Sequence, residues 1–171
     1  MKKHNGMRPQ DIVVILKIVL KRNNAWQMKD LSYELNISLS EISESIHRSV
    51  LAGLMAADKK TVLRQALLEF IKYGLKYVFP VKPGGIVVGL PTAHSTEILK
   101  KEISSKEVYV IPYFDGNTKG FEIEPLYAKL PFACSKDPEL CLVMGLIDCL
   151  RIGKNREVQL ANRELEKIIL C

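Results

Sequence analysis

The chain has 171 residues, of which 47% are hydrophobic and 26% charged, so it can bury a real core as one compact domain or one small domain with an extension. Its formal net charge of +6 favours an anionic partner. The excess lies early, because residues 1–60 hold ten Lys or Arg against six Asp or Glu. The apolar run IVVILKIVL is interrupted by Lys17 and is far shorter than the roughly 20 residues that cross a bilayer, so no membrane partner is expected.

The cysteines show no metal-site pattern. The four cysteines are Cys134, Cys141, Cys149 and Cys171. They form no C-x-x-C pair and have no histidine at metal-ligand spacing, so we expect free thiols and, for the protein, a reducing, cytoplasmic compartment. The glycines lack the spacing of a nucleotide-binding loop, and no cofactor is expected. His94 next to Ser95 has no accompanying acid or nucleophile elbow, which favours a capped loop over an active site. We therefore do not expect an enzyme.

Residues 27–54 predict two short helices joined by a tight turn. Leu31 and Leu35 lie four apart on one face of the first helix. Asn36 ends that helix, since Asn tolerates the left-handed conformation that a sharp turn requires. Ser38 followed by Glu41 has the spacing of a capping box, in which each side chain satisfies the other's backbone N–H. The second helix should begin there.

In this second helix, Ile42, Ile46 and Val50 recur at spacing four and should pack against the first helix, while polar residues face outward. The order of Leu31, Ser32, Leu35, Asn36, Ile37, Ser38, Ile42, Ile46 and Gly53-Leu54 resembles the helix-turn-helix of bacterial winged-helix regulators, including the MarR-like group. The resemblance covers roughly the first third of the chain. Asn36 stands where that family usually has Gly.

The resemblance implies a transcriptional regulator that reads double-stranded DNA, as a homodimer, with the helix that starts at Ser38. The residues expected at base edges are Ser38, Ser40, Ser43, Glu44 and His47, and those expected at phosphates are Arg48, Lys59, Lys60 and Arg64. The alternative is a protein-interaction module, antitoxin-like or an adaptor. The acidic outward face and the apolar terminal helices favour that alternative.

The first segment, residues 1–75, is expected to be a winged-helix-like DNA-binding module. Besides the two helices of residues 27–54, it contains a basic lead-in and two further helices. Residues 1–8 are either a solvated tail or a contact to phosphates. Pro9 suits a first helical turn, and the helix should run to about Arg22. That helix is apolar beyond one face, which indicates burial on several sides or a dimer interface. Residues 62–73 have helical spacing, with Gly74 as C-cap, and residues 55–60 suit a short strand and turn.

The middle segment, residues 76–135, predicts small β-hairpins. The runs KYVFPV and IVVGL flank a glycine turn, so a first hairpin over 76–90 is expected, which could serve as the wing or be structural. Residues 96–105 suit a short amphipathic helix or linker. EVYVIPYF and FEIEPL predict a second hairpin around Asp115-Gly116, limited in its pairing by prolines. Residues 130–135 are expected to be a connector.

The last segment, residues 136–171, predicts a helical hairpin. Asp137, Pro138 and Glu139 have the order of an N-cap, a first-turn proline and a first-turn acid. The helix that follows is apolar nearly all round and should be buried, ending near Gly153. A final amphipathic helix should start at about Asn155, and unmatched apolar surface on the pair would suit dimerisation. The fold class predicted for the whole chain is α+β, mainly helical.

Overall fold

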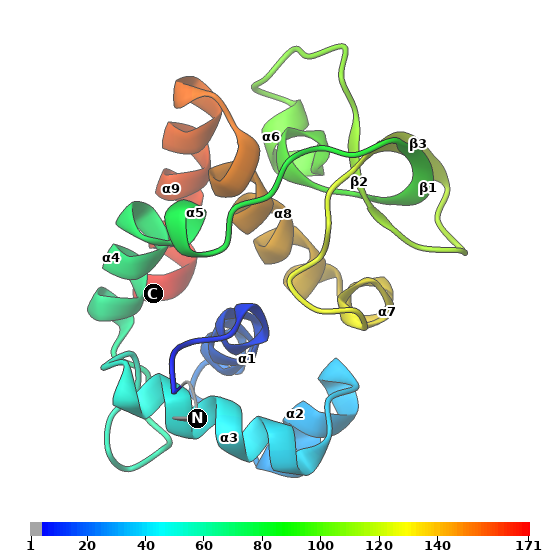
Figure 1. Cartoon of the computed structure of the whole chain (residues 1–171). Helices are drawn as coiled ribbons and strands as arrows, with labels where there is room; N and C mark the ends of the chain where they lie inside the picture. The colour runs from blue at the N-terminus through cyan, green and yellow to red at the C-terminus, as the bar shows by residue number, and fades with distance from the viewer. Residues whose placement is uncertain (1–4) are drawn as a thin grey trace.

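The computed structural model describes residues 5–171, so residues 1–4 of the predicted basic lead-in lie outside the described part. The chain is α+β and mainly helical, as predicted, with a small sheet at one side (Figure 1). The elements in chain order are α1 (Pro9–Leu20), α2 (Met28–Leu35), α3 (Leu39–Leu51), α4 (Arg64–Tyr73), α5 (Leu75–Val78), β1 (Ile86–Pro91), η1 (Ala93–Ser95), α6 (Glu97–Lys100), β2 (Tyr109–Pro112), β3 (Thr118–Glu122), α7 (Leu130–Lys136), α8 (Pro138–Ile152) and α9 (Asn155–Leu170).

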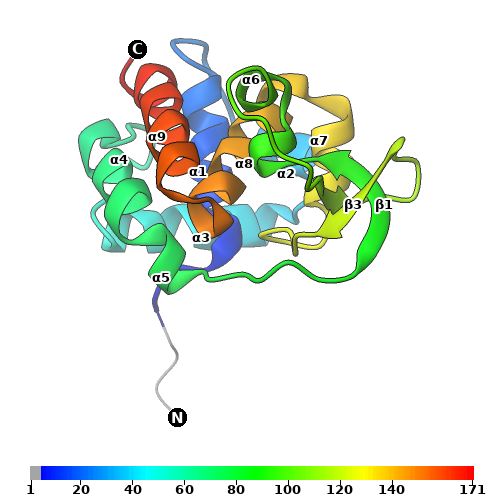
Figure 2. The same ribbon diagram turned by 90° about the horizontal axis from the view of Figure 1, so that it is seen from above.

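Helix α1 is the central element of the core. Every residue from Asp11 to Leu16 is buried, as are Ile18 and Val19. The helix packs against α2 and α3 on one side and against α8 and α9 on the other, and Figure 2 shows it among these helices. Of the two explanations for its apolar surface, burial on several sides is therefore confirmed. That surface is used inside the chain and does not form a free face for a dimer.

The C-terminal helical hairpin is confirmed. The Asp137 carboxylate accepts the Leu140 N–H at 3.0 Å and caps α8, and Gly153 is the C-cap. Helix α8 is buried over most of its length because it packs against α1, α5, α7 and α9. Most of the buried apolar residues form one cluster, to which each of the three predicted segments contributes.

The prediction of a β-hairpin over residues 76–90 is wrong. Its first half is the short helix α5, in which the Phe79 N–H donates to the Leu75 carbonyl at 2.9 Å. Leu75 and Phe79 are both buried, and their spacing of four is a helical spacing that places them on one face. Residues 76–78 between them are exposed, so the apparent alternation of the sequence is not a strand pattern.

The second predicted hairpin is half correct. Strands β2 and β3 are both extended, but they pair in parallel, and β1 is antiparallel to both, which closes a three-stranded barrel. Gly89 of β1 pairs with Pro112 on one side and Thr118 on the other. A Cβ at Gly89 would lie 2.0 Å from the Ile111 carbonyl oxygen, so only glycine allows this close approach.

Residues 130–135 are a helix, α7, rather than the predicted connector. Leu130, Ala133 and Cys134 are buried at spacings of three and four, because α7 covers α8 and contacts α2. Helix α6 is shorter than the predicted range 96–105. Among residues 5–171, none of the helices combines the length and the apolar character that crossing a membrane requires.

Candidate nucleic-acid interface

The turn between α2 and α3 has the predicted geometry. Asn36 adopts the left-handed conformation, with φ of 52° and ψ of 45°, and the Ile37 N–H donates to the Ser32 carbonyl at 3.1 Å. The Ser32 hydroxyl donates to the Ile37 carbonyl at 2.6 Å. Ser32 therefore bonds across the turn, which an alanine could not do. Together these contacts fix the angle at which α3 leaves α2.

The start of α3 confirms half of the predicted capping box. The Ser38 hydroxyl accepts the Glu41 N–H at 3.2 Å, as expected for an N-cap. The Glu41 carboxylate, however, does not return to Ser38. Its Oε1 accepts from Gln10 at 2.7 Å, from Arg48 at 2.7 Å and from Arg8 at 3.1 Å. Glu41 thus joins α3 to the start of α1.

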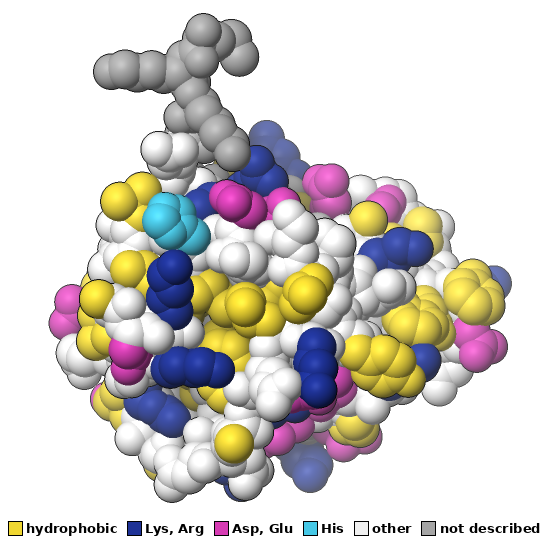
Figure 3. All heavy atoms as spheres, turned by 90° about the horizontal axis from the view of Figure 1, so that it is seen from below, with side chains coloured by type: hydrophobic (Ala, Val, Ile, Leu, Met, Phe, Trp, Pro, Cys, Tyr) yellow, Lys and Arg dark blue, Asp and Glu magenta, His cyan; other side chains and the backbone are white. Residues whose placement is uncertain are grey.

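The polar face of α3 is exposed. Ile42 and Ile46 are buried against the core, while the outward side chains at helical spacings of three and four are Ser40, Ser43, Glu44 and His47. Ser38 at the N-cap is exposed as well. Figure 3 looks at the molecule from the side of α2 and α3, where hydrophobic side chains lie among basic ones and a histidine, and acidic groups are scattered around them.

Arg48 is not on this face, and the expectation that it points outward to hold a phosphate is wrong. Its side chain is 7% exposed. Its Nε and Nη2 donate to the two carboxylate oxygens of Asp11 at 2.8 and 2.7 Å, and Nη2 also reaches Glu41. The hydrogen bonds that Arg48 donates to Asp11 raise the pKa of Arg48, and the one that it donates to Glu41 adds to them. This bidentate pair holds α3 against α1.

A short turn follows α3 and carries Lys59 and Lys60. Met55 and Val62 form an antiparallel bridge, which matches the strand and turn expected at 55–60. The Asp58 carboxylate accepts the N–H groups of Lys60 and Thr61 at 2.8 and 2.9 Å. These hydrogen bonds and one from the Thr61 hydroxyl lower the pKa of Asp58. The turn is therefore ordered, and both lysines are exposed on it.

The basic cluster predicted from Lys59, Lys60 and Arg64 does not form. The Lys60 ammonium donates to the Trp26 carbonyl at 3.2 Å and lies 4.3 Å from the centre of the Trp26 ring. Arg64 instead donates from Nη1 to the carbonyls of Ile169 and Cys171 at 2.6 and 3.1 Å. Because those carbonyls end α9, Arg64 caps that helix rather than offering a free guanidinium to a phosphate.

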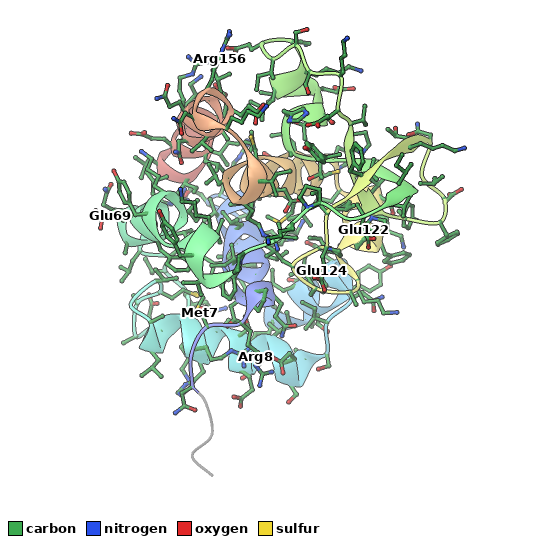
Figure 4. All side chains as sticks on the ribbon, turned by 45° about the horizontal axis from the view of Figure 1, so that its top comes forward. Met7, Arg8, Glu69, Glu122, Glu124 and Arg156 are labelled. Atoms are coloured by element: carbon green, nitrogen blue, oxygen red, sulfur yellow. The ribbon has the colours of Figure 1, made fainter. Side chains whose placement is uncertain are left out.

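Ion pairs inside the chain account for much of the positive charge near α3. The basic residues so engaged are Arg8, Lys17, Lys21, Arg22 and Arg48. Figure 4 labels Arg8 beside α3 and Arg156 at the far end of the molecule. Within residues 5–60, Lys29, Lys59 and Lys60 are exposed and make no ion pair. Lys29 on α2 was not predicted as a site residue, because its role depends on which face of α2 the core covers.

Exposed apolar side chains lie on the same two helices. The fractions exposed are 40% for Met28, 86% for Tyr33, 52% for Leu39 and 64% for Leu51. Leu39 is the first residue of α3 and extends beyond the core. Leu39 precedes Ser40, so the exposed face of α3, which was predicted to be polar, also carries an apolar side chain.

A cavity of about 460 Å³ separates α2 from the corner between α7 and α8, and Asn36 lines it. Lys17 also lines this cavity, and its ammonium contacts the carboxylates of Asp137 at 2.5 Å and Glu34 at 2.9 Å. Burial disfavours the charge of Lys17, but hydrogen bonds to these two carboxylates outweigh it and raise the pKa of Lys17. Burial likewise opposes the charge of Asp137, yet hydrogen bonds from Leu140 and Lys17 lower its pKa.

The described part of the chain contains no group of three or more His, Cys, Asp or Glu side chains that could hold a metal ion. His94 is a buried residue of the 3-10 helix η1 rather than of a loop, and its Nε2 lies 2.9 Å from the Glu107 carbonyl oxygen. The chain matches no protein-family model, no curated protein and no solved structure. The resemblance of residues 27–54 to winged-helix regulators therefore rests on the sequence of that segment alone.

Proposed function

We propose that the protein is a sequence-specific DNA-binding transcriptional regulator that places α3 in the major groove. The observation that carries this proposal is the rigid α2–turn–α3 unit, which presents Ser40, Ser43, Glu44 and His47 together on one exposed face. In helix-turn-helix proteins the N-terminal part of the second helix contacts base edges. Ser and His side chains can donate and accept hydrogen bonds there, and Glu44 can accept from the amino group of cytosine.

The phosphate contacts assigned to this complex are fewer than those predicted. Arg48 and Arg64 are engaged inside the chain and are removed from the set. Lys59 and Lys60 remain, on the turn that follows α3, and Lys29 is added from α2. A homodimer would double these contacts and read a palindromic site. The exposed aromatic side chains of Tyr73 and Tyr77 near α5 offer surface for such a dimer.

The decisive experiment measures binding of the purified chain to pooled fragments of its own genome by fluorescence anisotropy, with sequencing of the retained fragments. We expect enrichment of one palindromic site. Replacing Ser43 and His47 by Ala should weaken the specific site by roughly 5- to 150-fold per lost contact and leave non-specific binding unchanged. The matched control is Gln159→Ala, an exposed residue on α9. An equal loss on all sequences would refute base reading by α3.

The phosphate contacts have their own test in the salt dependence of binding. Replacing Lys59 and Lys60 by Ala should reduce the slope of log affinity against log salt by about 1 for each lost phosphate contact. Lys101 and Lys106 are exposed lysines in the second half of the chain, and their replacement by Ala should leave the slope unchanged. Equal slopes for the two double variants would show that the turn after α3 does not touch DNA.

A second candidate function is a protein-interaction module, and the exposed apolar side chains of Tyr33, Leu39 and Leu51 favour it. Exposed apolar side chains can mark protein contacts, and Leu39 and Leu51 lie at the two ends of α3. Under this alternative, no DNA fragment would be retained even at low salt. Replacing Leu39 and Leu51 by Ser would instead abolish capture of a tight partner protein.

A further inference from the structure

Helices α4 and α5 expose one stripe of side chains along residues 64–78. Gly74 joins the two helices in the right-handed helical region, with φ of −113° and ψ of −37°. The buried side chains of Leu67, Ile71 and Leu75 keep a spacing of four through this join. The helical phase therefore continues past Gly74, so the side chains opposite the buried ones lie together on one outward face.

Two tyrosines dominate this face. Tyr73 at the end of α4 is 73% exposed, and Tyr77 in α5 is 72% exposed. Val78 beside Tyr77 is also exposed. Tyrosine combines a large apolar ring with a hydroxyl group, and it is enriched in protein interfaces relative to the rest of the surface. The face therefore has the composition of a contact between proteins.

Side chains of opposite charge flank Tyr73. Glu69 precedes it by four residues and Lys76 follows it by three, and both are exposed. Figure 4 labels Glu69 at the outer edge of α4, where its carboxylate accepts from the Gln65 amide at 3.1 Å. The Lys76 ammonium lies 4.9 Å from the centre of the Tyr77 ring. Within residues 5–171, neither Glu69 nor Lys76 takes part in an ion pair.

We propose that this face binds the same face of a second copy of the chain, with the two α4 helices antiparallel and the two-fold axis beside Tyr73. Two-fold symmetry makes the interface self-complementary, so a residue before the axis meets a residue at a similar distance after it. At a rise of about 1.5 Å per residue, Glu69 lies about 6 Å before Tyr73, and Lys76 lies about 4.5 Å after it. Each Glu69 therefore meets the partner's Lys76, and the two Tyr73 rings meet at the axis.

The charges on the face identify a second copy as the occupant and fix its direction. One acid and one base lack partners in the described chain, and an antiparallel copy supplies a partner to both. Parallel helices would instead set Glu69 against Glu69 and Lys76 against Lys76. Because one helical face is smaller than a standard interface of roughly 1,600 Å², we expect a dissociation constant in the micromolar range.

The dimer would bring two α3 helices into one particle, because α4 follows α3 through the turn that carries Lys59 and Lys60. This names the interface of the homodimer in the proposed regulator. The reading of a palindromic site by the two helices rests on the proposed function, whereas the dimer itself does not.

Sedimentation velocity of the full chain, without DNA and over a concentration series that spans the micromolar range, measures the dimer. A reductant is present throughout, because the exposed Cys171 could otherwise join two copies by a disulfide. We expect a reversible equilibrium between monomer and dimer. Tyr73→Ala should raise the dissociation constant at least about tenfold, since the change removes a central aromatic contact from both copies.

Charge reversal tests the antiparallel register. Glu69→Lys and Lys76→Glu should each raise the dissociation constant about tenfold, because each change sets like charges against each other twice in the dimer. The double variant restores opposite charges, so its dissociation constant should return to within about threefold of the original value. The matched controls are Glu97→Lys and Lys106→Glu, at exposed residues outside this face, which should leave the dissociation constant unchanged.

A chain that stays monomeric throughout the concentration series would overturn the proposal. A dimer that Tyr73→Ala does not weaken would overturn it too, as would a double variant that dissociates as readily as the single charge reversals. The substituted side chains are exposed, so circular dichroism should show an unchanged fold for every variant. Because no DNA is present, failure of the dimer is distinguishable from failure of the proposed DNA binding.

Discussion

Replacing Arg48 should destabilise the protein strongly, because Arg48 is the buried partner of Asp11. The Asp11 side chain is fully buried, and Arg48→Ala would leave it only the Arg8 backbone N–H, at 2.8 Å, among the donors described. Removing one partner of a buried ion pair costs about 3–5 kcal/mol, because the remaining charge stays buried without compensation. For a chain of this length, that loss lowers the melting temperature by about 6–20 °C.

Urea unfolding followed by circular dichroism, with a thermal scan, measures this loss. The matched control is Arg22→Ala, because Arg22 pairs with Glu139 at 2.8 Å while both side chains are at least half exposed. That exposed pair should contribute at most about 1 kcal/mol. Arg48→Lys should also destabilise, since an ammonium cannot bind both Asp11 oxygens with a planar fork. An Arg48→Ala cost as small as that of Arg22→Ala would refute the reasoning.

Two further predictions concern the barrel and the α8 cap. Gly89→Ala should lower the free energy of unfolding in urea by about 3 kcal/mol, because its Cβ would lie 2.0 Å from a backbone oxygen. The control is Gly85→Ala, whose Cβ would meet nothing within 4 Å and which should change the free energy of unfolding by less than about 1 kcal/mol. Similar costs for the two variants would contradict the close approach at Gly89. Hydrogen bonds from Leu140 and Lys17 lower the pKa of Asp137, so its charged form stabilises the fold above its ordinary pKa of 3.8, and this stabilisation is lost as pH falls through the folded value. Asp137→Asn keeps an N-cap residue but removes the charge, so unfolding curves should show lower stability at pH 7 and a shallower decline below about pH 4. An unchanged acid limb would show that the charge of Asp137 contributes nothing.

The elements predicted correctly are those whose cause is local in sequence. Asn36 turns the chain, Ser38 caps α3, and Asp137 with Pro138 starts α8. Each of these signals acts on backbone groups within a few residues, so no knowledge of the rest of the fold is needed. The helix-turn-helix and the C-terminal hairpin followed directly from them.

The predictions that failed depended on partners distant in the chain. Arg48 was placed outward because its counter-ion Asp11 lies 37 residues earlier, on a helix whose position the sequence does not reveal. The hairpin assigned to 76–90 failed because two apolar residues four apart fit a helix as well as a strand, and burial decides between them. The parallel pairing of β2 and β3 occurs in a sheet in which β1, a strand outside the predicted hairpin, pairs antiparallel with both.

The distribution of charge sets the type of DNA complex that the proposed regulator would form. The excess of positive charge in residues 1–60 favoured an anionic partner, but Arg48 lies inside the core and Arg8 pairs with Glu41. Lys29, Lys59 and Lys60 remain exposed beside α3. Three phosphate contacts give a salt slope of about −3 for one chain and about −5 for a dimer. Such shallow slopes leave most of the specific affinity to the base contacts of α3, so the Ser43 and His47 variants should reduce specific affinity more than any lysine variant does.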